Sequence, residues 1–384
     1  MNKRNKIFAP IGIIGLGIAV ALAGLLAASC DMNGSNGSNN DPVIPSTGTI
    51  ADTGGMSGLS SLSFGNGRFF ARGSEGVLTS TNGINWLPVD FSATFGNNQV
   101  LAIAFTGGRW VAIGGNSTFA VSTNGIAWTH IDSAFFGGTW TWADNIFLRI
   151  TATGTAHSPD LVNWTEHPDN VIANIGGTME RFAFGNGVWV VGTSESGGSG
   201  AGGMAYSTDG ISWTAVESSP LTTDIHHLTF ANGKFVAIND NEKTLHSTNG
   251  IDWFEGTDLS FVEHTFAPWA LFSFFGGRFI MNVGHGKIAY SIDGSSWTVL
   301  TLFDADADVL FPRVVYGGLT FVAFGFDREA GNPTPRMAYS TDFNDWTDID
   351  LSGIFEGNNT ISNVVFGNRR FVALGQNGTI AYSN

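Results

Sequence analysis

Apolar and polar residues alternate in short runs that recur from residue 61 to the end of the chain. In the first unit, Ser61 to Phe64 forms one run, Asn66-Gly67 interrupts it, and Arg68 to Arg72 forms the next. Asn-Gly between two apolar runs is a strong hairpin signal, because a type I′ turn needs positive φ at both central residues. The pattern predicts short antiparallel strands joined by tight turns.

The same hairpin pattern occurs eight times along the chain. Each hairpin is followed by a third apolar run, and in seven units a fourth run starts at or just after a tryptophan. The further turns are predicted at Gly107-Gly108, Asp144-Asn145, Asn186-Gly187, Asn232-Gly233, Gly276-Gly277, Gly317-Gly318 and Asn368-Arg369. Each unit is therefore predicted to form a four-stranded antiparallel sheet.

A second motif ends the third strand in seven of these units. It consists of a serine, an Asp or Asn two places on, and a tryptophan four places further, and it recurs about every 43 residues, the period of a repeat architecture. The motif residues are Ser80, Asn82, Trp86, Ser122, Asn124, Trp128, Ser158, Asp160, Trp164, Ser207, Asp209, Trp213, Ser247, Asn249, Trp253, Ser291, Asp293, Trp297, Ser340, Asp342 and Trp346.

A four-stranded sheet with two apolar faces is not stable alone, so the units must stack on one another, and a closed ring leaves no end exposed. We therefore predict an all-β fold, a β-propeller of four-stranded antiparallel blades over residues 50–384. Counting hairpins gives eight blades, with seven as the alternative if one unit is degenerate. The last unit, Asn363 to Asn384, stops at its third strand, so the segment from Thr47 to Gly55 is expected to complete it and close the ring.

The tryptophan motif resembles the Asp-box, or bacterial neuraminidase repeat, of sialidases and of many non-enzymatic propellers. The resemblance covers nearly all of Ser61 to Asn384, although each copy is one residue shorter than the common SxDxGxxW spacing. It implies a structural turn in which Ser and Asp or Asn oxygens accept backbone N–H groups and the tryptophan packs on the blade. Asn82, Asn124 and Asn249 stand in the Asp position, which suits a turn better than a catalytic carboxylate.

A sialidase would need an arginine cluster, a tyrosine nucleophile paired with a glutamate, and an acidic aspartate. All five tyrosines occupy repeat positions: Tyr206, Tyr290, Tyr339 and Tyr382 precede a third-strand serine, and Tyr316 replaces a first-strand phenylalanine. The arginines that recur beside the hairpin turns are Arg68, Arg109, Arg278 and Arg370. These residues are predicted to belong to the scaffold, so sialidase activity is not expected and no catalytic residue is assigned.

The start of the chain has the features of a secretion signal. Basic residues are followed by an apolar stretch from Ile7 to Ala28 and then by Ser29-Cys30, and Cys30 is the one cysteine of the sequence. The pentapeptide LAASC resembles the bacterial lipobox, with Ala27 where leucine is commonest. This implies a signal peptide over residues 1–29, a lipid on Cys30 and a Gly/Ser/Asn-rich tether over 30–49. An uncleaved transmembrane helix is the alternative.

The formal net charge is −15, and loss of the three basic residues of the leader takes it to −18. Such a charge repels nucleic acid, so no nucleic-acid partner is expected. We predict no cofactor and no metal, because His226, His227 and His264 lack metal-ligand spacing. A lipid-anchored monomer of the bacterial envelope is expected, at the outer membrane or cell surface, with a carbohydrate or an envelope protein as partner.

One register of the repeat suggests a ligand site. The position three residues before the first-strand aromatic holds Arg181, His227 and Arg313 in three units, and we expect these side chains near one end of the channel. Their charge would suit an anion or an acidic sugar. The alternative is that each pairs with a loop acid, of which Glu180, Asp224 and Asp308 are the nearest candidates. His264, Trp269 and Glu242 are further candidates on the long loops.

These features favour a non-catalytic propeller lipoprotein that binds a ligand or partner at its loops, where side chains can vary without disturbing the sheets. Two alternatives remain at this stage. One is a glycoside hydrolase or lyase that acts on acidic polysaccharide, with Arg181 and Arg313 as carboxylate clamps and His227 or a loop acid such as Glu242 or Glu263 for proton transfer. The other is an assembly factor for a membrane complex.

Overall fold

A computed structural model describes residues 42–45, 48–96, 99–115, 118–131, 140–151, 153–174, 179–194, 203–217, 225–239, 243–258, 272–284, 286–303, 309–327, 333–355 and 359–383. The predicted leader and Cys30 lie outside these residues. Within the described ranges, no helix is long and apolar enough to cross a bilayer.

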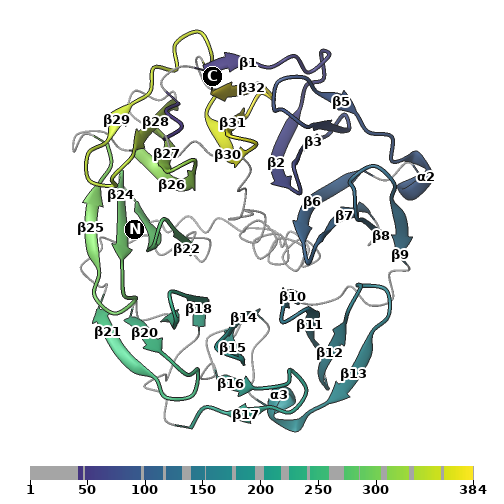
Figure 1. The fold of residues 1–384 in the computed structure, drawn as a ribbon, viewed down its shortest axis with the longest axis vertical. Coiled ribbons are helices and arrows are strands. Elements are labelled where there is room, and N and C mark those ends of the chain that lie inside the picture. Colours follow the sequence, from purple (N-terminus) through teal and green to yellow (C-terminus); the bar gives the residue numbers. More distant parts are fainter. Residues whose placement is uncertain are drawn as a thin grey trace, which may run out of the picture.

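The described residues form eight four-stranded antiparallel sheets, each a blade of one ring (Figure 1). Blades 1 to 4 consist of β2 (Leu59–Gly65), β3 (Arg68–Gly73), β4 (Val77–Ser80) and β5 (Leu87–Pro88); β6 (Val100–Thr106), β7 (Arg109–Gly114), β8 (Thr118–Ser122) and β9 (Thr129–Ile131); β10 (Trp140–Ala143), β11 (Ile146–Thr151), β12 (Gly154–Ser158) and β13 (Thr165–Pro168); and β14 (Met179–Gly185), β15 (Val188–Ser194), β16 (Met204–Ser207) and β17 (Thr214–Ala215).

Blades 5 to 8 consist of β18 (Ile225–Ala231), β19 (Lys234–Asn239), β20 (Lys243–Ser247) and β21 (Phe254–Asp258); β22 (Phe272–Phe275), β23 (Arg278–Gly284), β24 (Lys287–Ser291) and β25 (Thr298–Thr301); β26 (Val309–Gly317), β27 (Thr320–Asp327), β28 (Thr334–Ser340) and β29 (Thr347–Asp348); and β30 (Ile361–Gly367), β31 (Arg370–Gly375), β32 (Ile380–Ser383) and β1 (Gly48–Ile50). The first strand of every blade faces the centre of the ring in Figure 1. The predicted all-β propeller of eight blades is confirmed.

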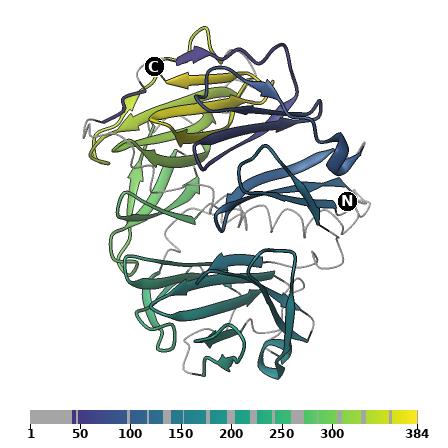
Figure 2. The ribbon, with the colours of Figure 1, turned by 45° about the vertical axis from the view of Figure 1, so that its right-hand side comes forward.

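The ring closes through the start of the folded chain. β1 pairs antiparallel with β32, with Gly48 opposite Ser383 and Ile50 opposite Ala381, and both views of the ribbon show the two strands side by side (Figures 1 and 2). The predicted fourth strand of the last blade is therefore confirmed. Because this strand comes from the other end of the folded chain, the fourth strand of blade 8 is in place only when the two ends meet.

The hairpin turns have the predicted geometry at seven of the eight sites. Asn66 and Gly67, for example, have φ of 44° and 70°, as a type I′ turn requires. The prediction is wrong in blade 7, where Gly317 pairs with Thr320 as a strand residue and the turn is Gly318-Leu319. Gly317 is required for packing instead, because a Cβ on it would overlap the ring of Phe366 in the next blade.

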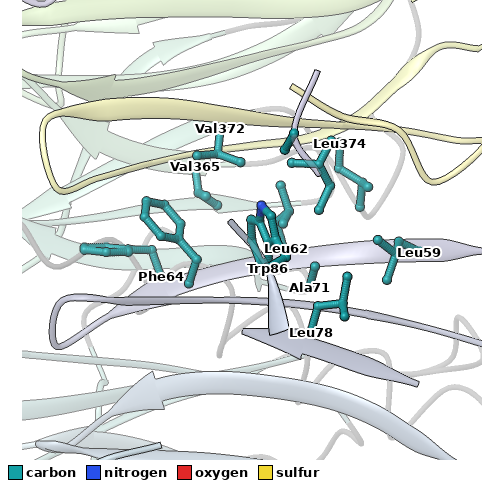
Figure 3. Close-up of a cluster of buried hydrophobic side chains, with 12 residues drawn as sticks. Leu59, Leu62, Phe64, Ala71, Leu78, Trp86, Val365, Val372 and Leu374 are labelled. Carbon is teal, nitrogen blue, oxygen red and sulfur yellow. The ribbon is translucent and has the colours of Figure 1, made fainter. Parts of the chain in front are cut away.

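The core lies between neighbouring blades, because each sheet presents one apolar face to the blade on either side. Figure 3 shows one such interface, where Leu62 and Trp86 of blade 1 pack against Val372 and Leu374 of blade 8. Leu62, Val372 and Leu374 are fully buried, and Trp86 is 5% exposed. Two short helices cover other interfaces at the rim: α2 (Ser92–Phe95) between blades 1 and 2, and α3 (Asn170–Asn174) between blades 3 and 4.

The ring has two faces with different connections. The tryptophan motifs and the hairpin turns between first and second strands share one face, which we call the box face. The connections between second and third strands, and those between blades, lie at the opposite ends of the strands, which we call the loop face. This division follows from the antiparallel order of the strands in each blade.

Candidate functional site

Each tryptophan motif forms a compact turn held by its serine and its Asp or Asn. In blade 1 the Ser80 hydroxyl donates to Asn82 Oδ1 at 3.0 Å and accepts from Gly83 N at 2.9 Å. Asn82 Oδ1 also accepts from the N–H groups of Ile84 and Asn85, at 2.9 and 3.0 Å. The same oxygen is present in Asn and Asp, so either residue caps the turn.

Two copies lack the usual glycine and still form the turn. Leu161 and Phe343 replace it, with φ of 66° and 74°, a region that L residues rarely adopt. Both side chains are buried between blades, and the guanidinium of Arg278 in blade 6 lies 4.7 Å from the Phe343 ring centre. Burial of a large apolar side chain offsets the backbone strain at these two positions.

The aspartates of these turns are held in their ionised form. Partial burial opposes ionisation of Asp160, but the N–H groups of Asn163 and Val162, with the side chains of Asn163 and Ser158, outweigh it and lower its pKa to about 2. The pKa of Asp293 is lowered in the same way by the residues that follow it. These carboxylates therefore act as hydrogen-bond acceptors of the scaffold.

Some of the recurring arginines and turn asparagines tie one blade to the next. Arg109 Nη1 donates to the Asp160 carbonyl at 3.2 Å, and Arg370 Nη1 donates to the Asn82 carbonyl at 2.9 Å. Asn186 Nδ2 reaches the Thr248 carbonyl at 3.0 Å. In all three cases the acceptor belongs to the tryptophan motif of the neighbouring blade, so these residues stabilise the ring.

The tyrosines also take part in packing. The ring of Tyr382 lies 5.2 Å from the guanidinium of Arg370, and the ring of Tyr290 lies 5.0 Å from Phe343. Tyr316 packs against Phe321 at 4.5 Å. The contacts of these three tyrosines are those expected of scaffold residues.

Two of the three residues predicted for the channel lie on neighbouring strands. Arg181 on β14 donates from Nε to the carbonyl of His226 on β18, at 2.8 Å. Burial lowers the pKa of the adjacent His227 to about 3, and electrostatic repulsion from Arg181 and from the neighbouring His226 adds to this effect. His227 is therefore neutral at pH 7, and its buried Nε2 makes no hydrogen bond within the described part of the chain.

Arg313 lies apart from that pair. It is in blade 7 on β26, whereas His227 is in blade 5, and the strand between them is β22 of blade 6, whose Phe272 ring lies 5.9 Å from His227. Arg313 Nη1 donates to the carbonyl of Ser362 in blade 8 at 3.2 Å. Arg181 and Arg313 therefore make the same kind of contact. Each donates to the carbonyl of the residue just before the same register position in the next blade, which is His227 for Arg181 and Asn363 for Arg313.

The remaining candidates of the sequence prediction are His264, Trp269, Glu242 and Glu263, and all four lie outside the described residues. So do Asp224 and Asp308, two of the loop acids considered as ion-pair partners. Among the residues that the structure describes, no group of three or more His, Cys, Asp or Glu side chains could hold a metal ion.

Two constellations were missed by sequence reasoning because they join different strands. His167 Nε2 and His157 Nδ1 lie 2.7 Å apart on β13 and β12, with ring planes 10° apart, which is the geometry of an N–H···N hydrogen bond. The second is an open groove between blades 6 and 7 that contains Trp346. In both cases the members are separated by a turn or by a blade, and no spacing within one strand marks them.

A cavity of about 30 Å³ lies beside β1, between blades 7 and 8, with Gly48, Ile354 and Phe371 among its lining residues. This is about the volume that one water molecule occupies in the liquid. It is a packing gap at the closure of the ring and too small for a ligand.

Comparison with known proteins supports the fold. The model of the DUF6242 beta propeller domain matches residues 158–324. No curated protein matches the chain. Among solved structures, the computationally designed Ika8 protein has a TM-score of 0.53 at 11% identity, covering 89% of this chain and 99% of its own.

BamB from Moraxella catarrhalis has a TM-score of 0.51 at 11% identity, with 88% of this chain and 96% of BamB covered. YCF48 bound to D1 peptide gives 0.47 at 15% identity, over 91% and 99% of the two chains. At these identities, the Ika8 and BamB matches support the propeller architecture alone.

Proposed function

We propose that this chain is a non-catalytic binding protein of the bacterial cell envelope, held at a membrane by a lipid on Cys30, with its loop face directed away from that membrane. The observation that carries this proposal is the place where the chain joins the ring. Val43 N donates to the carbonyl of Gly318 at 2.8 Å, and Gly318 belongs to a hairpin turn of the box face.

The path after Val43 leads from the box face to the loop face. β1 begins beside Ser383, at the end of β32, and continues toward Ile380, whose carbonyl accepts from Ala51 N at 2.8 Å. Ser57 N then donates to Glu75 Oε2 at 3.0 Å, and Glu75 lies between β3 and β4 on the loop face. A tether that precedes Val43 therefore leaves from the box face, which favours display of the loop face.

The ligand contact that we propose is the pair of Arg181 and His227, in the half of their strands nearer the loop face. The hydrogen bond to the His226 carbonyl fixes the Arg181 guanidinium, and the buried His227 beside it is neutral, so Arg181 carries the charge at this contact. A fixed guanidinium suits a carboxylate. The proposed ligand class is an acidic sugar or an acidic segment of an envelope protein.

Calorimetric titration with oligogalacturonate and with oligosialic acid tests the ligand class. We expect Arg181→Gln to weaken binding at least tenfold. Arg313→Gln is the control, because Arg313 has the same register but lies two blades beyond His227, and it should leave binding unchanged. Equal losses in both variants, or no binding by the wild-type chain, would argue against this contact. Shortening of either polymer during the titration would contradict the non-catalytic assignment.

The anchor is tested separately in the full chain. We expect Cys30→Ala to move the protein from the membrane fraction to the soluble fraction of a bacterial host. Retention of the variant in the membrane fraction would favour the uncleaved helix. A single membrane protein that copurifies in stoichiometric amount, and is lost with Arg181→Gln, would identify the partner as an assembly client.

A further inference from the structure

An open groove of about 650 Å³ lies at the rim of the ring, between blades 6 and 7. One wall is formed by Thr301 and the two residues after it, and the other by Asn344 and the segment from Trp346 to Asp348. The volume falls in the range of about 300–1,000 Å³ that is usual for small-molecule sites. It is thus large enough to hold a ligand.

Other interfaces between blades are closed by hydrogen bonds at the equivalent place. Asp169 Oδ2 accepts from Trp213 N at 3.1 Å where blade 3 meets blade 4. Thr257 Oγ1 donates to the Ser295 carbonyl at 3.0 Å where blade 5 meets blade 6. Leu302 donates its N–H to the Gly286 carbonyl at 2.8 Å, as Val216 does to Met204 within blade 4. Leu302 and Phe303 pack in one cluster with Phe343 and Trp346, and the groove lies over this contact.

The lining combines an aromatic plane with exposed polar groups. Trp346 is partly buried, as are Trp128 and Trp164, whereas the equivalent Trp213 and Trp253 are 5% and 4% exposed. Its indole N–H is already used, because it donates to the Phe343 carbonyl at 3.2 Å. The exposed amide of Asn344 and the hydroxyl of Thr347 provide donors and acceptors beside the indole.

Asp348 is the charged residue in the lining of the groove, and its carboxylate is paired with Arg336 beside the groove. Asp348, whose side chain is 64% exposed, lies 3.5 Å from Arg336 Nη2, and the Arg336 guanidinium lies 5.8 Å from the ring centre of Phe303. A strongly anionic ligand would meet the Asp348 carboxylate, and a cationic one would meet the guanidinium. An uncharged ligand with many hydroxyl groups can use both as hydrogen-bonding partners.

We propose that this groove binds a neutral oligosaccharide, with one sugar ring against the Trp346 indole and its hydroxyl groups hydrogen-bonded to Asn344 and Asp348. The apolar C–H face of a sugar ring packs on an aromatic plane, and its hydroxyls need donors and acceptors at the edge of that plane. The site lies at the rim and takes an uncharged ligand. This groove is therefore a different site, with a different ligand class, from the acidic-ligand site proposed at Arg181 and His227.

Calorimetric titration of the full chain with maltotetraose, cellotetraose and chitotetraose tests the groove. We expect at least one of them to bind, and Asn344→Ala and Asp348→Ala each to weaken that binding at least tenfold. Glu255→Ala is the matched control, because Glu255 takes the place of Asp348 in blade 5 and pairs with Lys243 at 3.4 Å. The control variant should bind like the wild type.

Three results would overturn the proposal. These are no binding of any of the three probes, binding by Asn344→Ala and Asp348→Ala that equals the wild type, or an equal loss in Glu255→Ala. Thermal melting of each variant separates a lost contact from a lost fold. Binding of oligogalacturonate should be unaffected by the groove variants, so the proposal can fail while the proposed function stands, and the reverse also holds.

Discussion

The side-chain amide of Asn368 donates to the carbonyl of Thr81 at 2.6 Å and joins the last hairpin turn of the chain to the first tryptophan motif. The same amide reaches the Gly67 carbonyl at 2.9 Å. Equivalent asparagines link other neighbouring blades. The bond from Asn368 to Thr81 differs because it joins residues 287 positions apart in the sequence and so closes the ring. The contact therefore opposes the separation of blades 8 and 1.

We expect Asn368→Gly to destabilise the protein by about 1–2 kcal/mol, the value of two exposed hydrogen bonds. Glycine keeps the positive φ of the turn and removes the amide alone. Denaturant unfolding measures the change. Asn66→Gly is the control, because its single bond to Thr123 is longer, at 3.3 Å, and its loss should cost less. A variant at 368 as stable as the wild type would refute the closing role.

The second prediction concerns β1. A chain that starts at residue 56 lacks the pairing of Gly48 to Ile50 with β32 and the buried Ala51, whereas a chain that starts at residue 42 keeps both. We expect the shorter chain to be less stable by about 2–4 kcal/mol, through lost strand pairing and an exposed edge. Denaturant midpoints of the two chains give the comparison, and equal midpoints would contradict it.

Much of this architecture could be predicted from the sequence, because its determinants are local. Asn66-Gly67 fixes a hairpin and its register through backbone sterics that do not depend on the rest of the chain. The last unit has only three strands in the sequence, so a fourth had to come from elsewhere, and this predicted the segment that contains β1. The prediction gave the strand order of each blade and the closure of the ring.

Gly317 shows where local reasoning fails. A glycine next to Gly318 in the sequence looks like half of a turn. Glycine is needed at position 317 for another reason, because the ring of Phe366 from the next blade leaves no room for a Cβ. The repeat register likewise gave Arg181, His227 and Arg313 equivalent places on their strands, but it did not show that β22 of blade 6 lies between the strands of His227 and Arg313. Contacts between blades depend on how the blades are arranged around the ring axis, and the spacing of residues along the sequence does not give this arrangement.

The third prediction tests this packing. We expect Gly317→Ala to destabilise the protein by about 1–3 kcal/mol, the usual cost of overpacking. The cause is contact with the Phe366 ring and not backbone strain, so the substitution should cost less in a Phe366→Leu background. A double-mutant cycle by urea unfolding measures the coupling. Additive effects would show that the ring of Phe366 is not the obstacle.

The fourth prediction concerns Asp160. Its pKa is about 2 in the folded chain, below the ordinary value of 3.8, so the folded state favours the carboxylate. The stability it contributes is complete above about pH 4 and is lost as the pH falls toward 2. We expect Asp160→Asn to cost about 1 kcal/mol at pH 7, through the lost charge-assisted bonds, and clearly less at pH 2, where about half of the Asp160 carboxyls are protonated. Equal costs at both pH values would contradict the assignment.

The last prediction concerns His227, whose pKa is about 3 in the folded chain and near 6.5 when unfolded. The unfolded chain binds more protons than the folded chain between these values, so stability falls as the pH decreases below 6.5. From pH 7 to pH 5 the loss is about 2 kcal/mol. His157 and His246, whose pKa values are lowered by burial and nearby cations or histidine, add to the same trend.

We expect His227→Phe to reduce this pH dependence by about 2 kcal/mol, because phenylalanine cannot be protonated and Phe272 occupies the same register in the next blade. Urea unfolding at pH 7 and pH 5 measures it, and Asp160 remains ionised at both. In an NMR titration, the ring signals of His227 should stay those of the neutral form above pH 4. A titration midpoint near 6.5 would mean that the ring is hydrated, and Arg181 would then have no effect on its charge.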